Sequence, residues 1–185
     1  MKKKRRLKEK TFQKHKGGQV WVETVVYLLI AFVMIGLVLA FIKPKIEEMR
    51  DRTVIEQSLG ILKEIDNSIT TIGSPGNKRL IEVGVRKGSI IIDSTTETVK
   101  FEIDSSYKYT EIGAPVQVGN IQALTTENGK NNKVTLTRDF SEGYDLTYDD
   151  QQIVKTLGKA ANPYRLFIEN KGESSSKLLI DFSAE

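Results

Sequence analysis

The chain has 185 residues, enough for one folded domain with an appended segment, and carries a formal net charge of +4. The basic excess lies in the first 18 residues, where nine Lys or Arg side chains accompany one Glu, so the remaining chain is mildly acidic. A nucleic-acid-binding domain needs a basic stripe on its folded surface, and this charge distribution argues against one. Cysteine is absent, which excludes a disulfide framework and a thiol site.

Residues 1–18 form a basic leader in front of a long apolar run. The run extends from Val20 to Ile42, and its 23 residues include a single charge, Glu23. As a helix it would be about 35 Å long, sufficient to cross a hydrocarbon layer of about 30 Å. A buried helix of a soluble protein usually keeps one polar stripe, and this run has none after Glu23. The sequence therefore predicts a transmembrane helix.

The two flanks of the apolar run predict its orientation. The leader is strongly basic, whereas residues 43–52 mix basic with acidic side chains. Because positively charged flanks stay in the cytoplasm, we expect the leader inside the cell and the C-terminal part outside. A cleaved secretory signal fits poorly, since its apolar region is shorter and ends at a small-x-small site that is missing here.

The junction between the leader and the apolar run combines glycines with a carboxylate. It reads Lys16-Gly17-Gly18-Gln19-Val20-Trp21-Val22-Glu23. Glycines leave an extended, accessible backbone for a peptidase, although they also suit a flexible hinge. A carboxylate in an apolar span costs a few kcal/mol at mid-membrane and less near an end. Glu23 is therefore either a pairing residue or a side chain that snorkels to the leaflet boundary.

This junction resembles the class III signal peptide of type IV pilins and archaellins, and its archaeal form in particular. The resemblance implies that a prepilin peptidase cuts after Gly18, which makes Gln19 the new N-terminus and Glu23 the fifth mature residue; a cut after Gly17 would make Glu23 the sixth. It also implies that Glu23 pairs with the α-amino group of Gln19 on a neighbouring subunit. The implied partners are a filament-assembly ATPase, its membrane platform and other copies of the chain or related pilins. The specific resemblance covers about residues 16–50.

Residues 43–73 are predicted to continue residues 19–42 as an amphipathic helix. Pro44 removes one backbone hydrogen bond and is a candidate kink. Apolar residues then recur mostly at steps of three or four, and charged residues fill the other faces. The predicted stripe comprises Ile46, Met49, Ile55, Leu59, Leu62, Ile65, Ile69 and Ile72. A Gly- and Pro-containing stretch at residues 73–77 predicts the end of the helix.

From residue 79 to residue 185 the apolar period changes to two, which predicts short strands separated by turns. The alternating apolar sets are Ile81/Val83/Val85, Val99/Phe101/Ile103, Val134/Leu136, Tyr144/Leu146/Tyr148 and Leu178/Ile180/Phe182. Residues 151–161 are expected to be a short helix or irregular. The predicted fold class is α+β, a long N-terminal helix followed by an antiparallel β-sandwich head. Many archaellins and archaeal pilins carry such a head, so the resemblance implies the same architecture.

Catalytic residues, metal ligands and cofactors are not predicted. The single histidine, His15, lies in the leader, so a folded Ser-His-Asp or His-metal site is excluded. Asp145, Asp149 and Asp150 lack the spacing of a calcium-binding EF-hand loop and are expected to be solvated. The chain is therefore not predicted to be an enzyme.

The function predicted from these features is that of a structural subunit of an archaeal type IV pilus-like or archaellum-like filament. The subunit would first be a single-pass membrane protein with a cytoplasmic leader and an extracellular head. After processing it would polymerise through its N-terminal helix into a cell-surface filament, a type of structure that serves adhesion or motility. The alternative is an uncleaved single-span protein that anchors a β-sandwich binding module at the cell surface.

Overall fold

The computed structural model describes residues 17–174 and 176–185, with side chains from residue 21 onward. The chain divides into two compact units, and the boundary falls between Lys43 and Pro44. One helix, α1 (Gly17–Thr70), runs through this boundary and contains Pro44 in its interior. The α+β class, with a long helix followed by strands, is confirmed.

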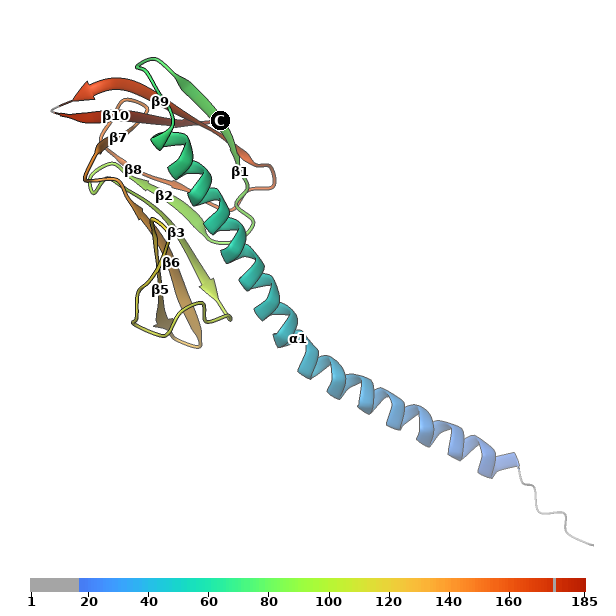
Figure 1. The fold of residues 1–185 in the computed structure, drawn as a ribbon. Helices are drawn as coiled ribbons and strands as arrows, with labels where there is room; N and C mark the ends of the chain where they lie inside the picture. Colours follow the sequence, from blue (N-terminus) through green and yellow to red (C-terminus); the bar gives the residue numbers. More distant parts are fainter. Residues whose placement is uncertain (1–16, 175) are drawn as a thin grey trace, which may run out of the picture. The chain divides into compact units, whose positions relative to one another are not determined.

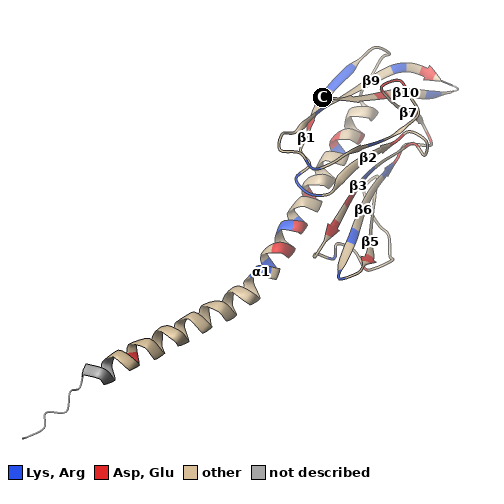
Figure 2. Ribbon diagram, turned by 180° about the vertical axis from the view of Figure 1, so that it is seen from behind, with Lys and Arg blue, Asp and Glu red and all other residues tan. Residues whose placement is uncertain are grey.

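Within the first unit, α1 is apolar around its whole circumference. From Trp21 to Ile42 the sequence has a single charged residue, Glu23. Figure 2 shows this part of the helix almost entirely in the colour of uncharged residues. An uninterrupted apolar sequence favours a helix in lipid, because each backbone N–H and C=O finds its partner within the same segment. Gly36 is the only glycine between Trp21 and Lys43 and does not interrupt the helix.

Within the second unit, α1 packs one face against the strands. The buried side chains recur at helical spacing from Asp51 to Ile69 and include Ile55, Leu62 and Ile65, as the amphipathic pattern predicts. The prediction for the start of this stripe was wrong, because Ile46 and Met49 are 43% and 69% exposed. The strands begin to cover the helix only after these two residues.

The helix ends at Thr70, slightly before the predicted position at residue 73. Thr71 and Ile72 still donate N–H groups to the carbonyls of Asn67 and Ile69, which closes the last turn. Gly73 then adopts a φ of +77°, a conformation that glycine adopts without steric cost. The chain can therefore leave the helix and enter the first strand.

The strands form two sheets, one of four strands and one of six. The first has the order β1 (Lys78–Val83), β9 (Tyr164–Ser174), β10 (Lys177–Ala184), β7 (Tyr144–Tyr148). The second has the order β4 (Val116–Val118), β5 (Ile121–Asn128), β6 (Asn131–Asp139), β3 (Thr98–Ser105), β2 (Ser89–Asp93), β8 (Val154–Leu157). The C-terminal half of α1 runs alongside these strands (Figure 1).

Two features of the sheets differ from the prediction. The predicted antiparallel pairing is found for every pair of neighbouring strands but one, because β10 pairs with β7 in parallel, with Leu178 opposite Tyr144. Parallel neighbours need a long connection, which the chain provides by crossing to β8 in the other sheet and returning through β9. Residues 151–161, expected to be helical or irregular, contain β8, which pairs with β2.

The core draws apolar side chains from α1 and from both sheets. Alternate residues of the strands point into it, as the period of two predicts; Val99, Phe101 and Ile103 of β3 are all buried. Ile65 from α1, Ile168 from β9 and other buried residues belong to the same cluster. The second half of α1 is thus an integral part of the head.

Candidate functional site

The first part of α1 presents a continuous apolar surface, which we call the exposed helix (residues 21–42). Every residue in it is exposed, and its large apolar side chains range from 38% exposed at Val25 to 83% at Phe41. The helix is long and apolar enough to cross a membrane. A contiguous apolar surface of this size does not persist in water, so lipid or another protein surface must cover it.

Glu23 is the one charged residue of the exposed helix. Within the described part of the chain it has no hydrogen-bond or ion-pair partner. In an apolar environment its carboxylate therefore needs a partner from outside the described residues, which makes Glu23 the chemically distinctive residue of this surface.

The predicted processing site lies at the beginning of α1. Gly17 and Gly18 belong to its first turn, so the extended backbone expected at the two glycines is not observed. The N–H groups of a first helical turn have no partner within the helix, and glycine stabilises helices poorly, so this turn is the easiest one to unwind. Gln19 also lies in this turn, and Lys16 lies outside the described residues.

Asp51 attaches α1 to the second sheet. It is only 4% exposed, forms an ion pair with Lys87 and accepts hydrogen bonds from the N–H and hydroxyl of Ser106 at 2.7 and 2.9 Å. Burial by itself would raise the pKa of Asp51, but the hydrogen bonds and the charge of Lys87 outweigh it and lower that pKa. Asp51 therefore stays ionised and fixes the helix to the loops that follow β1 and β3.

Asp66 attaches α1 at a second position farther along the helix. Its carboxylate lies 2.6 Å from the Nε of Arg138 on β6 and accepts a hydrogen bond of 2.9 Å from the side-chain amide of Asn120. The guanidinium of Arg138 also lies over the ring of Phe140, with its carbon 4.4 Å from the ring centroid. Asp51 and Asp66 together form what we call the two helix anchors.

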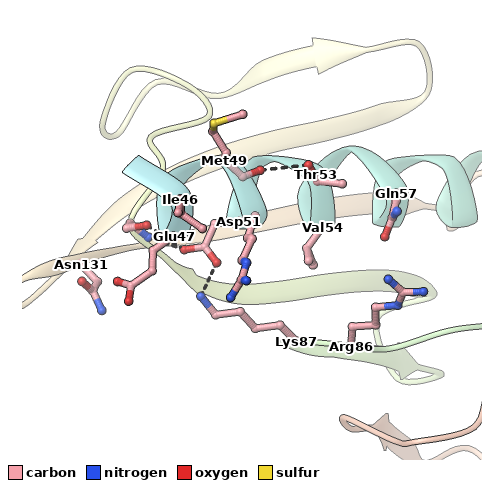
Figure 3. A pocket seen from close by; sticks show the side chains of 12 residues that line it. Ile46, Glu47, Met49, Asp51, Thr53, Val54, Gln57, Arg86, Lys87 and Asn131 are labelled. Atoms are coloured by element: carbon pink, nitrogen blue, oxygen red, sulfur yellow. Dashed lines mark hydrogen bonds and ion pairs between the residues drawn. The ribbon is translucent and has the colours of Figure 1, made fainter. Parts of the chain in front are cut away.

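A groove opens beside the first of these anchors, where the strands do not yet cover α1. This stem groove, of about 750 Å³, is formed by residues 46–57 of α1 and by loop residues that include Arg86 and Lys87. Figure 3 shows the Asp51–Lys87 pair at its wall, with Ile46, Glu47 and Val54 along the helix side. It therefore combines apolar side chains with both signs of charge.

The described residues contain no group of three or more His, Asp or Glu side chains that could hold a metal ion. Asp145 forms an ion pair with Lys177, and Asp150 forms one with Lys171, so these carboxylates belong to the polar surface of the first sheet. The buried carboxylate of Asp51 and the partly buried carboxylate of Asp66 serve as structural contacts.

Sequence reasoning singled out Glu23 but missed the helix anchors and the stem groove. The sequence placed Asp51 in residues 43–52, the segment of mixed charge that follows the apolar run. A signal was nevertheless present, because Asp51 lies four residues before Ile55 and hence on the same helix face as the buried stripe. Its partners, Lys87 and Ser106, could not be identified from local spacing.

Compared with protein-family models, with curated proteins and with solved structures, the chain matches none of them.

Proposed function

We propose that the chain is a structural subunit of a type IV pilin-like cell-surface filament, inserted in the membrane by the exposed helix and polymerised through it. The observation that supports this proposal is an apolar helix that is exposed on all sides and is continuous with a helix fixed in a folded head. Lipid covers the helix before assembly, and helices of other copies cover it afterwards. The two-sheet unit is then a β-sandwich head outside the cell.

Glu23 gives the proposed assembly its register. A carboxylate enclosed by apolar helices needs a partner, and cleavage after Gly18 would create one, the α-amino group of Gln19 on a neighbouring copy. Such a buried pair adds little net stability, but a misplaced charge is penalised, so the pair selects one alignment of the helices. A prepilin peptidase is the proposed processing enzyme, and the weakly held first turn of α1 suits its access.

The decisive experiment combines mass spectrometry of the native chain with electron microscopy of material sheared from cells. The expected result is filaments whose subunits begin at Gln19. Recovery of the chain only as a full-length, unpolymerised membrane protein would overturn the proposal and favour the uncleaved single-span binding protein. A mature chain that begins at Gly18 would move the cut by one residue and leave the assembly proposal intact.

Two variants separate processing from assembly. Gly18→Val adds a branched side chain at the cut and should block processing, so normal trimming of this variant would contradict the leader assignment. Glu23→Ala should leave insertion and cleavage unchanged but yield few filaments. Glu56→Ala is the matched control, because Glu56 is an exposed helix carboxylate of the head whose ion-pair partner among the described residues is the nearby Arg52. Wild-type filament yield from Glu23→Ala would remove the pairing role.

A further inference from the structure

The stem groove contains ionic groups that have no partner among the described residues. Arg50 and Arg86 both line the groove, and neither has an ion-pair or hydrogen-bond partner within the described residues. Glu47 lines it too and is likewise unpaired in this part of the chain. Lys87 differs, because Asp51 already neutralises it. The groove therefore offers two guanidinium groups and one carboxylate to a ligand.

The apolar side of the groove is also exposed. Ile46 and Met49 continue the stripe that is buried farther along α1, yet they are 43% and 69% exposed and border the groove. Figure 3 shows Ile46 and Val54 on the same stretch of helix as Glu47. A ligand that matches these walls has an apolar part, an anionic group for the arginines and a cationic group for the carboxylate.

We propose that the stem groove binds the headgroup of a zwitterionic phospholipid, phosphatidylethanolamine. Its phosphate accepts hydrogen bonds from Arg50 and Arg86, and its ammonium group faces Glu47. Its glycerol and the first carbons of its hydrocarbon chains cover Ile46 and Met49. Arginine is suited to this role because its planar fork matches phosphate oxygens. This inference rests on the proposed function, since it requires the exposed helix to be in a membrane.

The position of the groove along the chain agrees with such a ligand. Ile46 follows Ile42, the end of the apolar run, by four residues, which is about 6 Å of helix. The polar layer of a bilayer adds about 5–7 Å beyond the hydrocarbon on each side. Side chains on a helix lean toward its N-terminus, so Glu47 and Arg50 extend back toward that layer. Glu47 and Arg50 thus lie within reach of lipid headgroups, and Arg86 lines the same groove.

The test uses the full-length chain in nanodiscs that contain phosphatidylethanolamine and an uncharged glycolipid in equal amounts. Native mass spectrometry after release from the nanodiscs counts the lipids that stay bound. The wild-type chain should retain phosphatidylethanolamine in preference to the glycolipid. The double variant Arg50→Gln/Arg86→Gln should retain about tenfold less phosphatidylethanolamine, because each substitution removes a charge-assisted contact with the phosphate. Arg52→Gln is the matched control, because Arg52 pairs with Glu56 and does not line the groove; it should bind as the wild type does.

Several outcomes would overturn the inference. Equal retention by the wild type and the double variant would remove the two arginines from lipid binding. Full displacement of the lipid by excess inorganic phosphate would identify a site for free anions. A lipid-free dimer that the double variant loses would identify a second copy as the occupant. Failure of the wild-type chain to enter the nanodiscs would instead contradict the proposed membrane insertion, so the two proposals fail in different ways.

Discussion

Removal of the Asp51 carboxylate tests whether the first helix anchor stabilises the head. In Asp51→Ala, Lys87 loses its ion pair and Ser106 loses the acceptor of its N–H and hydroxyl. Hydrogen bonds to charged groups contribute about 1.5–3 kcal/mol each. The Lys87 side chain is 46% exposed, however, and Ser106 is exposed, so hydrogen bonds to water replace much of the lost interaction energy. We expect a net loss of about 2 kcal/mol, which lowers the melting temperature of a unit of this size by about 6 °C.

The assay is thermal unfolding of the full-length chain in detergent micelles, followed by far-ultraviolet circular dichroism of the strands. Tryptophan fluorescence is unsuitable, because Trp21 is the only tryptophan and lies in the exposed helix. Glu56→Ala is the matched control: this side chain is 53% exposed, and its loss should cost no more than about 0.5 kcal/mol. Equal melting temperatures for Asp51→Ala and Glu56→Ala would refute the reasoning.

Three further predictions concern the head. Ile65→Ala removes a fully buried side chain and should cost about 2–5 kcal/mol, whereas Met49→Ala, at an exposed site, should leave denaturant unfolding nearly unchanged. Gly88→Ala should destabilise the head by about 2 kcal/mol or more, because Gly88 has a φ of +82° and an added Cβ would meet the carbonyl of Glu102; Gly84→Ala has open space and should change the melting temperature little. Burial would raise the pKa of Asp93, but hydrogen bonds from the following turn lower it to about 2 from 3.8. The stabilising contribution of the ionised Asp93 carboxylate is therefore complete above about pH 4 and is lost as the pH falls toward 2. Asp93→Asn lacks this contribution at every pH, so its stability should fall less than that of the wild type during an acid titration.

Local periodicity predicted the parts of the fold that depend on neighbours in sequence. The long helix, the stripe from Ile55 to Ile69 and the alternating strands all follow from periods of 3.6 and two. Periodicity does not specify which strands become neighbours, and so the parallel β7–β10 pair was not predicted. The strand β8 was missed because only four residues form it, and its central Lys155 and Thr156 are not apolar.

The candidate site also contains one feature that the local sequence reveals and others that depend on the tertiary fold. Glu23 was recognisable because a lone charge in an apolar run is unusual at the level of sequence alone. The helix anchors depend on residues far apart in the chain: 36 positions separate Asp51 from Lys87, and 72 separate Asp66 from Arg138. The stem groove exists only because the strands stop short of Met49, which is a property of the tertiary fold.

The two parts of α1 satisfy their polar groups in opposite ways, and this contrast fits a subunit that assembles through its helix. Glu23 has no partner among the described residues, so any group that compensates its charge lies outside them. Asp51 and Asp66, by contrast, find every observed partner within the head. They are 15 residues apart, about 22 Å along the helix, and fall near the same face. Two anchors so placed oppose both rotation and sliding of the helix, because either movement would strip an ionised carboxylate of its donors while also displacing the buried stripe. In the proposed filament, these contacts and the buried stripe would carry force between the head and the polymerised helix, because the chain has no disulfides.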